Sequence, residues 1–111
     1  MSSKLIAHEL ALQAAITIVP LLDSVRAPHR ALAHQARRAV ASISSNLAEG
    51  AGRQGKDRAY HWSIALGSAR ETHSVLRLMV GIGAVDAAQG HQALGRLDRV
   101  QAITWRLVNP R

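Results

Sequence analysis

The sequence contains no Cys, no Phe and only three aromatic residues, two Trp and one Tyr. The absence of cysteine excludes disulfides, zinc sites built from thiolates, and thiol nucleophiles. The scarcity of aromatic side chains leaves few rings on which the bases of a single-stranded nucleic acid could stack. Proline is also scarce, with three residues, so long uninterrupted helices are sterically permitted.

Acidic residues are scarce as well, with 7 Asp and Glu against 14 Lys and Arg, which gives a formal net charge of +7. A field of this sign attracts polyanions, so the expected partners are nucleic acid, anionic lipid or an acidic protein. No motif for reading bases is visible. Any binding to RNA or DNA is therefore expected to be electrostatic and independent of nucleotide sequence.

The length of 111 residues, with 48% apolar and 19% charged residues, predicts one folded domain spanning residues 1–111. This is too short for a two-domain nucleotide-dependent enzyme or a (β/α)₈ barrel. His8, Glu9 and Gln13 interrupt the apolar residues near the start of the chain. We therefore expect neither a signal peptide nor a membrane span, and we expect a cytoplasmic protein.

Stretches rich in Ala, Leu and Arg favour helix almost throughout, because these residues cost least in a helix interior. Turn signals lie at Ala27-Pro28, in the glycine-rich run 50–55 and at 83–86, where Asp86 and Gln89 can form a capping box. Since the connections are short, consecutive helices should be antiparallel, which predicts an all-α, up-down-up-down four-helix bundle. The predicted helices span about residues 3–26, 29–52, 56–82 and 87–108.

The first and third predicted helices each carry two apolar stripes on different sides. A helix in a four-helix monomer buries one stripe, and monomers avoid large exposed apolar patches. We therefore expect a homo-oligomer, although a wide core that absorbs both stripes is the alternative. The residues predicted to form the contact between subunits are Ile18, Leu21, Ile64, Val75, Leu78 and Ile82.

A polar stripe borders the apolar seam of the second predicted helix. It consists of Gln35, Ser42, Asn46 and Glu49, which fall within a narrow arc at helical spacing. Half-buried amides and carboxylates need hydrogen-bond partners, so a structural role against a neighbouring helix or subunit is predicted. A catalytic role is disfavoured because no second carboxylate and no orienting His lie near Glu49 at helical spacing.

Candidates for enzyme chemistry are missing. The six His include no pair four residues apart, so we expect no metal site and no cofactor. The run from Gly50 to Asp57 superficially resembles a phosphate loop, but it follows a predicted helix and lacks the Gly-Lys-Ser/Thr ending. It is more typical of a helix C-terminus with glycine at positive φ. We therefore expect a protein that is not an enzyme.

The basic residues gather in clusters. One cluster lies in the predicted linker after the second helix, and two arginines share a face of the third helix with Ser and Gly, where a nucleic-acid backbone could approach closely. The predicted phosphate-contacting residues are Arg53, Lys56, Arg58, Arg70 and Arg77. The alternative is that these charges are solvated and meet an acidic protein instead.

The second and third predicted helices carry a pattern that resembles a known family. This family comprises small proteins encoded by intervening sequences inside bacterial 23S ribosomal RNA genes, and it includes the accessory protein of diversity-generating retroelements. The match covers about residues 28–86, with His73 standing where relatives tend to have Glu. The residues that carry it are Gln35, Arg37, Arg38, Ser42, Ile43, Asn46, Leu47, Ala48, Glu49, Gly50, Gly52, Arg53, Ile64, Ala65, Leu66, Gly67, Ser68 and Glu71.

This resemblance implies an antiparallel four-helix bundle and a tendency to form homo-pentameric rings. For the retroelement members it further implies binding to nucleic acid and to a reverse transcriptase. None of the relatives is known as an enzyme. The resemblance thus favours five subunits for the expected homo-oligomer and adds a reverse transcriptase to the expected partners.

Overall fold

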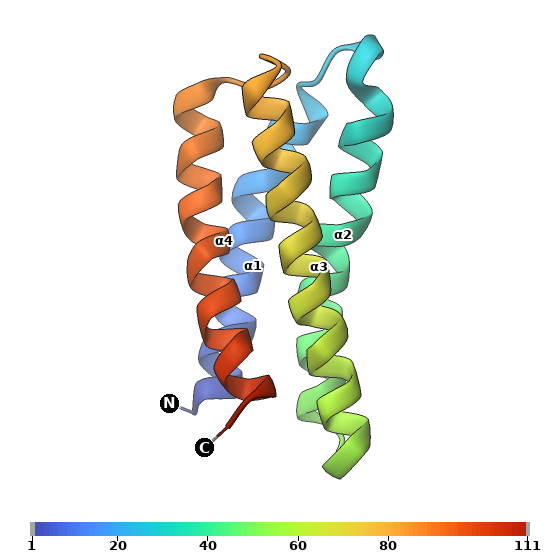
Figure 1. Cartoon of the computed structure of the whole chain (residues 1–111), viewed down its shortest axis with the longest axis vertical. Coiled ribbons are helices and arrows are strands. Elements are labelled where there is room, and N and C mark those ends of the chain that lie inside the picture. Colours follow the sequence, from blue (N-terminus) through green and yellow to red (C-terminus); the bar gives the residue numbers. More distant parts are fainter. Residues whose placement is uncertain (1, 111) are drawn as a thin grey trace.

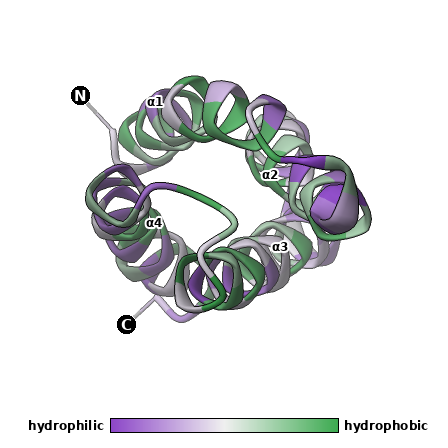
Figure 2. Ribbon diagram, turned by 90° about the horizontal axis from the view of Figure 1, so that it is seen from above, coloured by the Kyte–Doolittle hydropathy of each residue, from purple (hydrophilic) through white to green (hydrophobic). Residues whose placement is uncertain are grey.

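The computed structural model describes residues 2–110, which form four long α-helices and no strand (Figure 1). Each helix packs against two neighbours, and α1 and α3 occupy opposite corners of the bundle (Figures 1 and 2). The predicted all-α, up-down-up-down four-helix bundle is confirmed. The elements are α1 (Ser3–Asp23), the 3₁₀ turn η1 (Ala27–His29), α2 (Arg30–Ala51), α3 (Gly55–Gly81) and α4 (Ala87–Val108).

Side-chain caps set the ends of the helices. The Ser2 hydroxyl accepts a hydrogen bond from the Leu5 N–H at 3.4 Å and begins α1. The Asp86 carboxylate accepts one from the Gln89 N–H at 2.9 Å and begins α4, as predicted. Helix α1 ends earlier than predicted because the Ser24 hydroxyl donates to the Leu21 carbonyl at 2.7 Å and takes up that free acceptor.

A core of alanine and aliphatic side chains fills the centre of the bundle, which measures 43 × 22 × 19 Å. Small residues on α1 let its neighbours approach closely, while larger side chains from the other helices fill the space between them. The largest fully buried side chains are Ile18, Ile43, Leu47, Leu76, Met79, Leu97, Val40, Val100, Thr72 and Thr104.

Helix α1 is the most uniformly apolar helix of the bundle (Figure 2). By length and composition it could cross a membrane, with a mean hydropathy of 1.7 over its most apolar 18-residue window. A core helix of a folded bundle has the same properties. In this bundle α1 contributes Ala7, Ala11, Ala14, Ile18, Leu21 and Leu22 to the buried core.

The structure corrects half of the predicted subunit contact. Ile18, Leu21 and Val75 are buried inside the single chain, so the expectation that they contact another subunit is wrong. The reason is that the two stripes of each helix are similarly apolar, and the sequence did not show which one faces inward. Ile64 is half-buried.

A different set of apolar side chains faces outward. On α3, Leu78 and Ile82 are 50% and 47% exposed, as the predicted contact requires. On α1 the outward stripe consists of Leu5, Leu12 and Ile16, which are 55%, 36% and 72% exposed. Because α1 and α3 lie at opposite corners, these two apolar surfaces point away from each other.

The hairpin of α2 and α3 is closed by a glycine that leaves room for a tryptophan. Gly50 is buried within α2, and a Cβ atom placed on it would lie 2.5 Å from Cδ1 and Nε1 of Trp62. The Trp62 indole N–H donates to the Leu47 carbonyl at 3.4 Å. The glycine run was predicted to end a helix with glycine at positive φ, but Gly52 caps α2 with φ of −87° and the positive φ of +58° falls at Gly55, the first residue of α3. At Gly50 the requirement is space.

We predict that Gly50→Ala destabilises the bundle by about 1–3 kcal/mol, because the added methyl group overlaps the Trp62 ring. The matched control is Gly67→Ala on α3, where a Cβ meets nothing within 4 Å. That change should stabilise the protein by about 0.5–1 kcal/mol through helix propensity. Chemical denaturation of both variants checks this, and equal effects of the two substitutions would contradict the close approach.

Candidate nucleic-acid interface

A line of polar side chains joins α2 to α3 beside the core. The Gln35 amide donates to the Glu71 carboxylate at 3.2 Å. Further along, the Ser68 hydroxyl lies 2.8 Å from that of Ser42 and donates to it. We call the residues of this line the α2–α3 seam, namely Gln35, Ser42, Asn46, His61, Ser68 and Glu71.

Asn46 is the centre of the seam. Its amide N–H groups donate to the Ser42 carbonyl at 2.9 Å and to the Ser42 hydroxyl at 3.0 Å. Its carbonyl oxygen lies 3.0 Å from Nδ1 of His61. Since a carbonyl oxygen only accepts, Nδ1 of His61 carries the proton and donates it. The polar stripe predicted on α2 thus meets α3 at Gln35, Ser42 and Asn46.

Glu49 departs from this arrangement, because its carboxylate points to Arg53 on its own side of the hairpin. The Arg53 Nε–H donates to Glu49 Oε2 at 2.9 Å, and Nη2 of the same guanidinium lies 2.8 Å from that oxygen. This hydrogen bond and the charge of Arg53 lower the pKa of the Glu49 carboxyl below its ordinary value of 4.5. Among residues 2–110, Glu49 therefore has no hydrogen bond to a neighbouring helix, and its predicted contact with another subunit stays a prediction.

Arg53 is partly neutralised by this pairing. Its guanidinium also lies 3.9 Å from the Asp57 carboxylate in the first turn of α3. Both pairs are solvent-exposed, so each contributes little to stability. They do offset the positive charge of Arg53. At the junction of α2 and α3, the exposed Lys56 is then the cation with no carboxylate partner among the described residues.

Arg58 serves the fold. Its Nε–H donates to the Gly50 carbonyl at 3.1 Å and its Nη2–H donates to the Ala51 carbonyl at 3.2 Å. The guanidinium lies 5.2 Å from the centre of the Trp62 ring, within cation–π range. Because these bonds reach carbonyls in the last turn of α2, Arg58 caps that helix, and its predicted contact with a phosphate stays a prediction.

Arg70 and Arg77 lie together on the exposed side of α3. Both line a groove of about 520 Å³ between α3 and α4, which also includes Ser74 and Gln101. The Gln101 side-chain oxygen is buried and has no hydrogen-bond partner among residues 2–110. The groove therefore offers two guanidinium groups, with Leu78 and Ile82 at one end.

A contact between a histidine and an aspartate lies on the same face. His73 Nε2 lies 2.9 Å from the Asp98 carboxylate and links α3 to α4. This contact could not be predicted from the sequence, because the two residues are 25 positions apart and lie on different helices. Within residues 2–110, no cluster of three or more His, Asp or Glu side chains is arranged to hold a metal ion.

The geometry defines a small helical-bundle protein with a polar seam in one hairpin and a cationic groove beside it. The sequence profile of the family described as 23S rRNA-intervening sequence protein matches residues 3–106. The chain therefore belongs to that family, as its motif indicated. No curated protein matches the chain.

Among solved structures, the chain is similar to a protein of unknown function from the S23 ribosomal protein family of Bacteroides thetaiotaomicron. The two share 20% sequence identity with a TM-score of 0.87, and the similarity covers 97% of this chain and 99% of that one. At this identity the likeness establishes the fold.

We predict that Asn46→Ala lowers the free energy of unfolding by about 1–3 kcal/mol, because it removes two hydrogen bonds to Ser42 and leaves the half-buried His61 N–H without its acceptor. Glu49→Ala should leave the melting temperature nearly unchanged, since the Glu49 carboxylate is exposed and its hydrogen-bond partner is the equally exposed Arg53. Thermal melts at pH 7 check the contrast. Two variants that both melt like the parent would show that the seam has no structural role.

Proposed function

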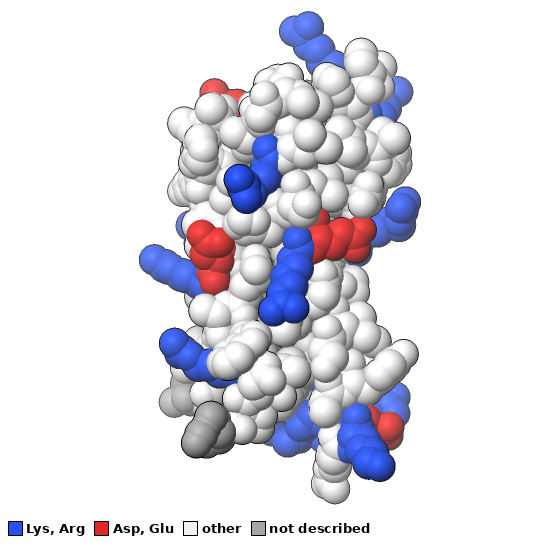
Figure 3. Space-filling view, in the orientation of Figure 1, with Lys and Arg blue, Asp and Glu red and all other residues white. Residues whose placement is uncertain are grey.

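We propose that this protein is a self-assembling, non-enzymatic bundle that binds the phosphate backbone of RNA or DNA without reading its sequence. The observation that carries the proposal is a set of four arginines on the α3–α4 side that have no carboxylate partner. Among residues 2–110, no carboxylate lies within 4.0 Å of a guanidinium nitrogen of Arg70, Arg77, Arg99 or Arg106. Blue side chains are spread over the whole length of this face (Figure 3).

The groove favours a polyanion. Arg70 and Arg77 are seven residues apart on α3, so their Cα atoms are separated by about 10 Å along the helix axis. Ser74 lies between them and offers a hydroxyl that can donate to a phosphate oxygen. No aromatic ring lines the groove, which supports backbone contact in place of base stacking.

The two outward apolar surfaces support self-assembly. The stripe of Leu5, Leu12 and Ile16 and the pair Leu78 and Ile82 lie on opposite corners of the bundle, so the first surface of one copy can cover the second surface of the next. Such a head-to-tail contact closes into a ring when the rotation per subunit divides the circle. The family resemblance favours five subunits.

A ring strengthens weak contacts. Each subunit repeats the groove by symmetry, so a nucleic acid that reaches several grooves gains affinity through multivalency. An acidic protein is the alternative partner for the same cations. The experiments below separate the two.

For binding, we predict that Arg70→Gln/Arg77→Gln reduces affinity for a single-stranded oligonucleotide at least tenfold at about 50 mM salt, where phosphate contacts are strong. The control Arg26→Gln/Arg38→Gln removes the same charge from exposed positions off the groove and should weaken binding much less. Fluorescence anisotropy measures both.

The outcomes separate the candidate partners. Equal losses in the two double variants would show that binding follows net charge and would contradict the groove. If the parent protein does not bind oligonucleotides at this salt concentration, the nucleic-acid function fails and an acidic protein becomes the better partner.

For assembly, we predict that Ile16→Glu and Leu78→Asp each convert the oligomer to a folded monomer, because each buries an unpaired charge at the contact. Ala41→Asp places the same charge on an exposed position of α2 and should leave the oligomer intact. Light scattering at micromolar concentration gives the masses, and circular dichroism verifies the fold. A monomeric parent would contradict self-assembly.

A further inference from the structure

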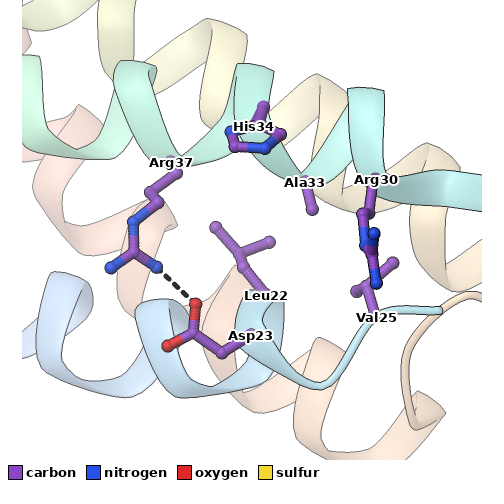
Figure 4. Close-up of a pocket in the computed structure, with 7 residues that line it drawn as sticks. All are labelled: Leu22, Asp23, Val25, Arg30, Ala33, His34 and Arg37. Carbon is purple, nitrogen blue, oxygen red and sulfur yellow. Dashed lines mark hydrogen bonds and ion pairs between the residues drawn. The ribbon is translucent and has the colours of Figure 1, made fainter. Parts of the chain in front are cut away.

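A second basic site lies at the corner between α1 and α2, away from the groove. A pocket of about 240 Å³ is bounded by Arg30, His34 and Arg37 on one face of α2 and by Asp23 at the end of α1. Figure 4 shows Arg30 and Arg37 reaching down from α2 on either side of the pocket. Its remaining lining is apolar and consists of the nearly buried Leu22, Val25 and Ala33.

The charges of this pocket are not balanced within the chain. Asp23 is its only carboxylate, and that carboxylate pairs with Arg37 (Figure 4). Arg30 has no ion-pair partner among residues 2–110. Arg30 is therefore the cation of this pocket that has no anion beside it.

The start of α2 adds to the positive potential. The first turn of α2 holds no acidic residue, and His29 makes no side-chain capping hydrogen bond. The positive end of the helix dipole therefore remains uncompensated, which favours an anion close to Arg30.

We propose that this pocket binds a phosphate monoester, either free inorganic phosphate or the terminal phosphate of a nucleic-acid strand. A monoester carries nearly two negative charges near pH 7 and ends in oxygens that two guanidinium groups can clamp. A diester carries one charge, and its chain must leave on both sides, which suits a groove better than a pocket. Binding of the terminal phosphate of a strand, the strand-end arm of the proposal, rests on the proposed function. Binding of free phosphate does not.

The Asp23 carboxylate occupies Arg37 as an internal anion. Both side chains are at least half exposed, so their pairing is weak and an incoming dianion can displace it. The displacement frees Arg37 to join Arg30 on the same phosphate. Asp23 thus acts as a competitor of the ligand and not as part of its binding set.

The first test uses inorganic phosphate and thermal melting. Phosphate at 10 mM should raise the melting temperature of the parent by about 2 °C or more over sodium chloride of equal ionic strength. Arg30→Gln/Arg37→Gln should abolish this gain, and the charge-matched Arg26→Gln/Arg38→Gln should keep it. Equal gains in both double variants would assign the effect to diffuse charge and overturn the site.

The second test compares one oligonucleotide with and without a 5′-phosphate. The phosphorylated strand should bind the parent about tenfold more tightly, a difference that Arg30→Gln/Arg37→Gln removes. Equal affinities of the two strands would overturn the strand-end arm. If neither strand binds while phosphate still raises the melting temperature, the proposed function fails and the pocket stands.

The third test removes the competitor. Asp23→Asn should tighten phosphate binding severalfold, because it leaves Arg37 unpaired. Glu9→Gln makes the same change in net charge from an exposed position on α1 outside the pocket and should have a much smaller effect. Weaker binding in Asp23→Asn than in Glu9→Gln would show that Asp23 organises the site and would contradict the proposed competition.

Discussion

The contact of Gly50 with Trp62 is the constraint on which the α2–α3 hairpin depends. With no Cβ on Gly50, the indole ring lies directly against the α2 backbone and donates to the Leu47 carbonyl. Arg58 then lies over the same ring and caps the last carbonyls of α2. The missing Cβ of Gly50 therefore sets the position of the Trp62 ring, of the Arg58 side chain over that ring, and of α3 along α2.

That register places the polar residues of α2 opposite those of α3. With the end of the hairpin fixed, Asn46 meets His61, and Ser42 meets Ser68. The same packing determines which cations are available to a binding partner. Arg58 is used as a cap and Arg53 is paired with Glu49, so of the five predicted phosphate contacts Lys56, Arg70 and Arg77 have no partner among residues 2–110.

Sequence reasoning predicted the four helices and their order well, because helix propensity and turn residues are local properties. It failed where two choices looked alike from the sequence. Ile18 and Leu78 both belong to apolar stripes of similar strength, yet the first is buried and the second is half exposed. Only the packing of four helices around one core decides between such stripes.

The candidate site was predictable in part for a related reason. The polar stripe on α2 was visible at helical spacing, whereas its partners on α3 depend on the pairing of two helices. The capping role of Arg58 was hidden, because the sequence shows a basic cluster and does not show that two carbonyls of α2 point at one member of it. The pocket at Arg30 and Arg37 is completed by the end of α1. The predicted helix ran to about residue 26, whereas α1 ends at Asp23.

The central claim is that the positive charge of this bundle meets nucleic-acid phosphates without regard to base sequence. The most direct test is the affinity of the parent protein for two unrelated single strands of equal length, measured from about 50 to 200 mM salt. The account predicts that log Kd rises linearly with log salt concentration, with one slope for both strands of about 0.7 per phosphate contacted. A flat response to salt, or affinities for the two strands that differ more than tenfold, would contradict it.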